Sequence, residues 1–169
     1  MKIESLCFIQ RPPEILLGLK KRGFGMGRLN GFGGKFKPGI DQSIKATAKR
    51  ETEEECGLVI EISDLEKVGI IEYNFKDGSE TKIVHIFKCS HFKGEPVETG
   101  EMRPEWFIAK KDKIPIENMW SSDLYWIDFL LQGKKFKGKF LYDQPSKPDR
   151  NAVVLEKFIE EVESFPNED

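Results

Sequence analysis

The chain has 169 residues, of which 38% are hydrophobic and 33% are charged, and its formal net charge is −2 at pH 7. This length indicates one domain spanning residues 1–169, with about five frayed residues at the C terminus. The small negative charge argues against general attraction to nucleic acid or anionic membranes, and no apolar run is long enough to span a bilayer. We therefore expect neither as a partner.

The three cysteines, Cys7, Cys56 and Cys89, are widely spaced and lie among apolar neighbours. This pattern is typical of reduced, buried thiols in an intracellular protein, and no CxxC motif or histidine cluster indicates zinc. The N-terminal residues lack the apolar core of a signal peptide. We expect the protein in the cytoplasm, with the nucleus and the mitochondrial matrix as alternatives.

The first part of the chain alternates short strands and turns. Residues 3–10 and 14–19 are predicted strands, separated by Pro12-Pro13. Residues 22–40 form a glycine-rich loop with a short strand at its centre. A helix then runs to about Cys56, with Asp41 as its N-cap and Gly57 as its stop signal.

The second part continues the mixed α and β pattern. Residues 66–75 and 80–90 flank an Asp-Gly pair and predict a hairpin, and residues 104–109 predict a further strand. A second helix, capped by Ser121 or Ser122, extends to about residue 131, and residues 136–142 follow as a strand. Residues 152–163 fit either a helix or a strand.

The first predicted helix carries acidic residues on the side that should be buried. At about 100° per residue, Glu51 and Glu55 fall close to the apolar direction set by Ile44, whereas Glu54 lies on the flank and Glu53 points to the opposite side. Buried carboxylates at this spacing repel one another, and a hard divalent cation such as Mg²⁺ or Mn²⁺ relieves that cost. The alternative is a solvated acidic surface with ordinary i,i+4 lysine pairs.

Residues 34–58 resemble the signature of the Nudix hydrolases, because Arg50-Glu51, Glu54-Glu55 and Gly57-Leu58 match it in type and spacing. Beyond this signature, the chain resembles, up to about residue 142, the eukaryotic Nudix hydrolases that act on oxidised purine nucleotides. This resemblance is carried by residues 15–25, 30–35, 101–107 and 119–126.

The resemblance implies an α+β protein with the Nudix fold, an α/β/α sandwich around a mixed sheet. It also implies metal-dependent hydrolysis of oxidised purine nucleoside triphosphates to the monophosphate and pyrophosphate, with 8-oxo-dGTP as the expected substrate and 2-hydroxy-dATP as a further candidate. Such an enzyme removes damaged nucleotides from the pool used for DNA synthesis, and we expect it to act as a monomer.

The resemblance further implies a metal site and a set of catalytic residues. The metal, Mg²⁺ or alternatively Mn²⁺, would be held by the Gly33 carbonyl and by Glu51, Glu54, Glu55 and Glu101. Glu54, Glu55 and Glu101 would also be catalytic, with Arg50 fixing the carboxylates by hydrogen bonds. The residues themselves leave open that Glu101 is an exposed loop acid and that Arg50 forms only a surface pair with Glu54.

The same resemblance implies that residues far apart in the chain form a pocket for the base. Lys20 would lie at its edge and attract the triphosphate. Trp120 offers a face on which a purine can stack, and Asn30 has both donors and acceptors for a purine edge. The pocket would be built from Ser5, Phe24, Asn30, Tyr73, Phe75, Trp120, Ser122 and Asp123.

The chain departs from the family pattern near the start of the signature. The segment between Gly34 and Arg50 is two residues longer than usual, and the early glutamate is replaced by Ile40 or Gln42, depending on the register. Asp41 lies between them and is the candidate substitute. Because that glutamate supports the helix through the arginine, we predict reduced rigidity rather than lost activity.

A second departure lies in the base pocket. Related triphosphatases have two adjacent aspartates after the pocket tryptophan, whereas this chain has Ser122-Asp123. Two neighbouring carboxyls can share a proton, but a serine hydroxyl does not titrate. We predict that 8-oxo-dGTP remains a substrate and that breadth toward oxidised adenine nucleotides changes.

Other functions remain open from the sequence. A Nudix hydrolase of normal or otherwise modified dNTPs, or of nucleotide sugars, uses the same chemistry. The missing early glutamate also allows a catalytically weak nucleotide-binding protein. An RNA-binding or decapping role is disfavoured because the chain has no extended basic surface.

Overall fold

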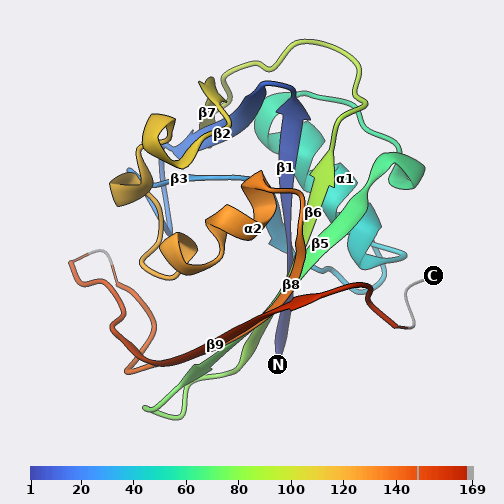
Figure 1. The fold of residues 1–169 in the computed structure, drawn as a ribbon. Coiled ribbons are helices and arrows are strands. Elements are labelled where there is room, and N and C mark those ends of the chain that lie inside the picture. The colour runs from blue at the N-terminus through green and yellow to red at the C-terminus, as the bar shows by residue number, and fades with distance from the viewer. Residues whose placement is uncertain (148, 167–169) are drawn as a thin grey trace.

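The computed structural model describes residues 1–147 and 149–166. In this part of the chain the strands are β1 (Lys2–Arg11), β2 (Glu14–Lys20), β3 (Leu29–Asn30), β4 (Phe32–Lys35), β5 (Glu66–Phe75), β6 (Lys82–Cys89), β7 (Met102–Ile108), β8 (Lys135–Tyr142) and β9 (Val154–Val162). They form one sheet in the order β3-β2-β1-β6-β5-β8-β9, while β4 pairs with β1 and β7 pairs with β2 (Figure 1). The β1–β6 and β5–β8 pairs are parallel and the others are antiparallel, so the sheet is mixed.

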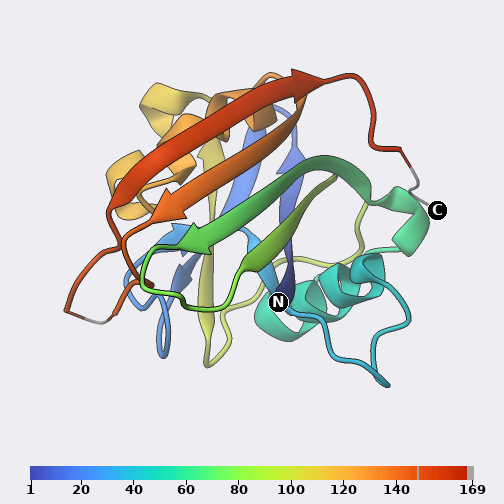
Figure 2. The ribbon, with the colours of Figure 1, turned by 90° about the horizontal axis from the view of Figure 1, so that it is seen from below.

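Helices cover both sides of this sheet. The long helix α1 (Ile44–Cys56) lies on one side, and the short helix α2 (Ile127–Leu131) lies on the other with the 3₁₀ turns that precede it (Figure 2). Side chains of β1 alternate between the two cores, because Cys7 packs in the core that contains Ala48 of α1, whereas Phe8 packs in the core that contains Trp126. The predicted α+β class and the sandwich around a mixed sheet are confirmed.

Helix α1 begins two residues later than its predicted cap implies. Ser43 is the N-cap, and its hydroxyl accepts a hydrogen bond from the Ala46 amide at 3.1 Å. Asp41 as N-cap is therefore wrong, since its carboxylate is engaged elsewhere. Gly57 ends the helix as predicted, in the left-handed conformation with φ 75°.

The predicted second helix is wrong in its extent. The chain forms a 3₁₀ turn at Asp123–Tyr125 and then the five-residue α2, and neither Ser121 nor Ser122 caps a helix with its side chain. The ambiguous segment at residues 152–163 is a strand, β9, which pairs antiparallel with β8 along its length. Pairing with β8 decides in favour of the strand, although the apolar residues also fit helical spacing.

The remaining predicted elements are present. The glycine-rich loop contains two short strands, β3 and β4, and the predicted hairpin is the β5–β6 pair. Cys7, Cys56 and Cys89 are buried free thiols. No helix in residues 1–147 and 149–166 has the length and apolarity to cross a bilayer. The predicted fraying of the C terminus falls mainly on residues 167–169, which lie outside the described part.

Candidate active site

Helix α1 places its glutamates as the sequence predicts. Glu55 is 3% exposed, the Glu51 side chain is 12% exposed, and the Glu54 side chain is 55% exposed. Glu53 is exposed on the opposite side. The acidic run is therefore not a uniformly solvated surface, and two of its carboxylates point into the protein.

Strand β4 makes room for these two carboxylates because it contains adjacent glycines. A Cβ atom at Gly34 would lie 2.6 Å from the carboxyl carbon of Glu51, and one at Gly33 would lie 1.9 Å from the carbonyl oxygen of Ser5. The Gly33 amide donates a hydrogen bond to Glu55 at 3.3 Å. Any larger residue at these positions would separate β4 from β1 or from the helix.

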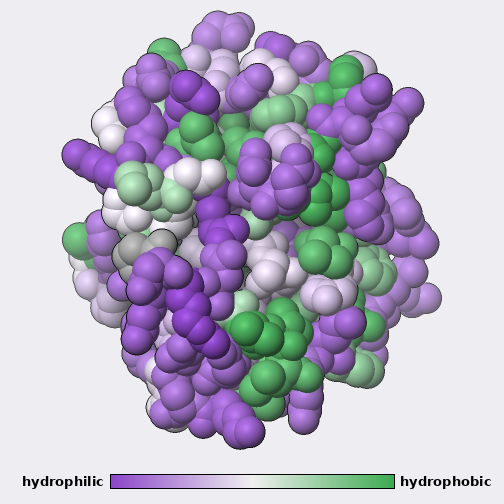
Figure 3. Space-filling view, turned by 90° about the vertical axis from the view of Figure 1, so that its left-hand side faces the viewer, coloured by the Kyte–Doolittle hydropathy of each residue, from purple (hydrophilic) through white to green (hydrophobic). Residues whose placement is uncertain are grey.

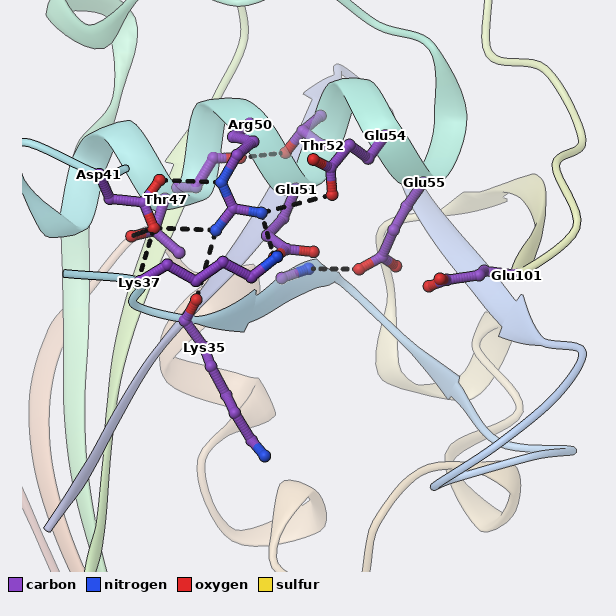
Figure 4. Close-up of polar contacts among 12 residues, drawn as sticks. Lys35, Lys37, Asp41, Thr47, Arg50, Glu51, Thr52, Glu54, Glu55 and Glu101 are labelled. Carbon is purple, nitrogen blue, oxygen red and sulfur yellow. Dashed lines mark hydrogen bonds and ion pairs between the residues drawn. The ribbon is translucent and has the colours of Figure 1, made fainter. Parts of the chain in front are cut away.

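Arg50 connects the acidic residues of the helix to the loop before it (Figure 4). Its guanidinium donates to both carboxylate oxygens of Asp41 at 2.8 Å each, to Glu51 at 2.6 Å and to Glu54 at 3.3 Å. It also donates to the Lys35 carbonyl at 3.3 Å. Arg50 is therefore a hub of five hydrogen bonds, which is more than the surface pair with Glu54 left open by the sequence.

Asp41 is the candidate substitute for the missing early glutamate, and it belongs to the Arg50 network. Besides its bidentate pair with Arg50, its carboxylate accepts from the Lys37 amide at 2.9 Å and from the Thr47 hydroxyl at 3.0 Å. The hydrogen bonds from Arg50 hold the pKa of Asp41 well below its ordinary value of 3.8. These bonds tie the loop before the helix to α1, and the reduced rigidity expected from the missing glutamate stays a prediction.

We predict that Asp41→Asn lowers the free energy of unfolding by about 2 kcal/mol at pH 7, because an amide offers Arg50 one acceptor in place of two charged ones. The folded-state pKa of Asp41 is depressed, so its contribution is complete above about pH 4 and disappears as the pH falls further. Denaturant unfolding from pH 7 to pH 3 measures this. The exposed Asp64→Asn is the matched control, and equal effects of both substitutions would contradict the proposed pairing.

Glu55 lies in an electrostatically unfavourable position. Burial raises the pKa of Glu55 from 4.5 to about 8. The negative charges of Glu51 and Glu101 add to this rise, whereas Lys20 and the hydrogen bond from the Gly33 amide oppose it. The carboxyl is thus close to like charges, and within the described ranges it forms no ion pair, although Lys20 lies near enough to lower its pKa. Such a group is suited either to share a proton or to bind a cation.

Glu101 comes from the loop before β7 and lies on the far side of Glu55 from Glu51 (Figure 4). Its carboxylate is paired with Lys20 at 3.6 Å and with Arg22 at 3.8 Å. The structure therefore brings this distant acid next to the helix. Glu54 is the most exposed of the four predicted acids, and like Glu51 it is paired with Arg50.

The donor set suits a hard divalent cation. No three His, Cys, Asp or Glu side chains in the described ranges are already arranged around a common metal position, since Arg50 holds Glu51 and Glu54 and Lys20 holds Glu101. However, the buried Glu55 carboxyl lies between two other carboxylates beside the Gly33 backbone. Oxygen ligands with an excess of negative charge fit Mg²⁺ or Mn²⁺.

A cleft of about 810 Å³ extends from Glu55 across the sheet. Every residue predicted for the base pocket lines it, and so do Gly33 and Lys20 at the end near the carboxylates. Several lining residues were not predicted, because neither spacing nor residue type distinguishes them from core or loop positions. They include Gly25, Arg28, Met102, Tyr142, Pro145, Ser146 and Ala152.

Trp120 is held at the rim of the cleft by two neighbours. The exposed ring of Phe24 stacks on it with centroids 5.1 Å apart and an interplanar angle of 22°. The Arg28 guanidinium lies 4.5 Å from the centre of the Trp120 ring. Phe24 and Arg28 therefore place an aromatic ring and a cation beside the indole, and groups of both kinds also bind purines.

Polar groups line the cleft beside Trp120. Asp123 is 3% exposed and accepts a hydrogen bond from the Trp120 amide at 3.0 Å, and burial raises its pKa from 3.8 to about 7. The hydroxyls of Tyr73 and Ser122 lie 3.2 Å apart. Ser5 has a buried hydroxyl without a hydrogen-bond partner in the described ranges, which is a polar group that a bound base could satisfy.

Comparison with known proteins decides the family. A model of the NUDIX domain matches residues 4–127. The chain belongs to the Nudix family. Two curated relatives named oxidized purine nucleoside triphosphate hydrolase are similar over 97% of both chains, at 41% identity in Danio rerio and 43% in Mus musculus.

Solved structures agree with the Nudix fold. A MutT protein from Bacillus halodurans matches 95% of this chain and 98% of its own, with a TM-score of 0.75 and 25% identity. A MutT Nudix hydrolase from Burkholderia pseudomallei matches 75% of this chain with a TM-score of 0.63 and 22% identity, which shows the shared fold. The Nudix signature is thus embedded in the fold in which other Nudix proteins carry it.

Proposed function

We propose that this Nudix protein hydrolyses oxidised purine nucleoside triphosphates to the monophosphate and pyrophosphate, with 8-oxo-dGTP as a substrate. The supporting observation is that one cleft joins an aromatic platform at Trp120 to the buried carboxyl of Glu55. The names of the curated relatives from Danio rerio and Mus musculus support the substrate class.

In this proposal one end of the cleft binds the base and the other end binds the phosphates. Trp120 stacks the base, while Asp123, Ser122 and Asn30 meet its polar edge. Lys20, now paired with Glu101 at 3.6 Å, attracts the phosphates. The anhydride bond then lies near Glu55, at the carboxylate end of the cleft.

Glu51, Glu54, Glu55 and Glu101, with the Gly33 carbonyl, are the groups that would hold Mg²⁺ or Mn²⁺. Bound there, the ion would offset phosphate charge and acidify an attacking water. A carboxylate of this set would accept a proton from the attacking water, and Arg50 keeps Glu51 and Glu54 in place by hydrogen bonds. The protein acts as a monomer in the cytoplasm. By removing oxidised nucleotides from the pool, it limits mutation of DNA.

A panel of nucleotides tests the proposal directly. Pyrophosphate release from 8-oxo-dGTP, 2-hydroxy-dATP, dGTP and a nucleotide sugar is measured with Mg²⁺, with Mn²⁺ and with chelator. We expect the highest kcat/KM for 8-oxo-dGTP and no release without a divalent ion. Release of inorganic phosphate instead of pyrophosphate, or preference for the nucleotide sugar, would overturn the assignment.

A further inference from the structure

The described part of the loop between β8 and β9, residues 143–147 and 149–153, contributes to one wall of the cleft and lies outside the segment that matches the NUDIX model. Pro145, Ser146 and Ala152 of this loop line the cleft. On the side of the molecule where this loop lies, apolar side chains form patches between polar ones (Figure 3). The loop is therefore a feature of the site that the Nudix signature does not include.

Hydrogen bonds within the loop hold its two ends together. The Asp143 amide donates to the Val153 carbonyl at 3.1 Å, and the Val153 amide donates back to the Asp143 carboxylate at 2.8 Å. The Ala152 amide donates to the Ser146 hydroxyl at 2.8 Å, and Arg150 is paired with Asp143. These hydrogen bonds therefore fix the backbone on which Asn151 and Ala152 lie.

Two contacts join the loop to the segment around Trp120. The Arg28 guanidinium donates to the Asn151 side-chain oxygen and to the Met119 carbonyl, the latter at 2.9 Å, while lying 4.5 Å from the Trp120 ring centre. The Ser121 hydroxyl donates to the Ala152 carbonyl at 3.5 Å. The residues on both sides of Trp120 in the sequence are therefore tied, directly or through Arg28, to the loop.

We propose that Asn151 is a positioning residue for the base: it fixes Arg28, and through Arg28 the ring of Trp120, so that the β8–β9 loop sets the affinity of the cleft for purines. An arginine side chain has many rotamers, and a second acceptor from the loop restricts it to the one that lies against the indole. The proposal rests on the proposed function, because it assigns the loop a role in binding the same substrate.

Kinetics of Asn151→Ala test this role. We expect KM for 8-oxo-dGTP to rise roughly fivefold while kcat stays within about twofold, because the carboxylates lie at the other end of the cleft. Fluorescence titration with 8-oxo-dGMP, in the absence of a divalent ion, should show a parallel rise in Kd. This binding measurement does not depend on catalysis, so it can fail separately from the proposed function.

Further variants separate positioning through Arg28 from a general effect on the loop. Asn151→Asp keeps an acceptor for the guanidinium and should retain the wild-type KM, and Gln144→Ala removes an amide from the same loop away from the cleft and should change nothing. In an Arg28→Ala background, Asn151→Ala should have no further effect. An additive effect in that background, or an unchanged Kd for Asn151→Ala alone, would overturn the proposal, whereas absent hydrolysis by the wild type would refute the proposed function instead.

Discussion

Glu55→Gln is expected to lower kcat for pyrophosphate release about a thousandfold while leaving the protein at least as stable as the wild type. The loss follows because an amide neither accepts a proton from water nor binds a divalent cation strongly. Folding should not suffer, because glutamine has the same volume and its oxygen can still accept from the Gly33 amide. Activity and stability should thus change in opposite directions.

The pH dependence of stability provides a second measurement on the same variant. The pKa of Glu55 is about 8 in the folded protein against an ordinary value of 4.5, so folding takes up a proton between these pH values. In the absence of divalent ions, Glu55 therefore makes the free energy of unfolding fall as the pH rises from about 4.5 to about 8. Glu55→Gln should remove this part of the slope.

A matched substitution on the same helix controls for helix effects. Glu53 is exposed on the opposite side of α1, so Glu53→Gln should leave both kcat and the pH slope at their wild-type values. Thermal melts at several pH values and single-substrate kinetics cover both variants. A Glu55→Gln protein that retains near-normal kcat would contradict the assigned role of the buried carboxyl.

The burial of this carboxyl could be predicted because it follows from helical periodicity within one short segment. Glu51 and Glu55 share the direction of Ile44, and the structure buries them accordingly. The helix start could not be located as well, because Asp41 and Ser43 are both good caps. Asp41 is drawn to Arg50 instead, which leaves Ser43 to cap the helix.

Contacts between distant segments set the limit of sequence-based prediction. Arg28 and Asn151 are 123 residues apart, and no local pattern indicates that they meet. The same holds for β9, whose apolar spacing fits a helix but whose backbone pairs with β8. The base pocket could be predicted only through family resemblance, since an isolated aromatic residue is more often part of a core.

Asp123→Asn should lower kcat/KM for 8-oxo-dGTP by about 10- to 100-fold at pH 8, mainly through KM. At this pH the wild-type carboxyl, whose pKa is about 7, is mostly ionised and, in the proposed function, would accept from an N–H group of the base. One oxygen already accepts from the Trp120 amide at 3.0 Å. An asparagine would use its only oxygen there and turn its NH₂ group toward the donors of the base. The exposed Asp112→Asn is the control and should leave kcat/KM unchanged.

Because Ser122 does not titrate, a single protonation at Asp123 should govern base preference. Below about pH 7 the carboxyl donates a hydrogen bond, so KM for 8-oxo-dGTP should rise as the pH falls from 8 to 6. KM for 8-oxo-dATP, whose ring N1 is an acceptor, should fall over the same range. In Asp123→Asn both trends should vanish, and Ser122→Asp should replace the single step by two coupled ones. If instead both KM values keep their pH dependence in Asp123→Asn, another group determines base preference, and the buried aspartate serves only to bind the Trp120 amide.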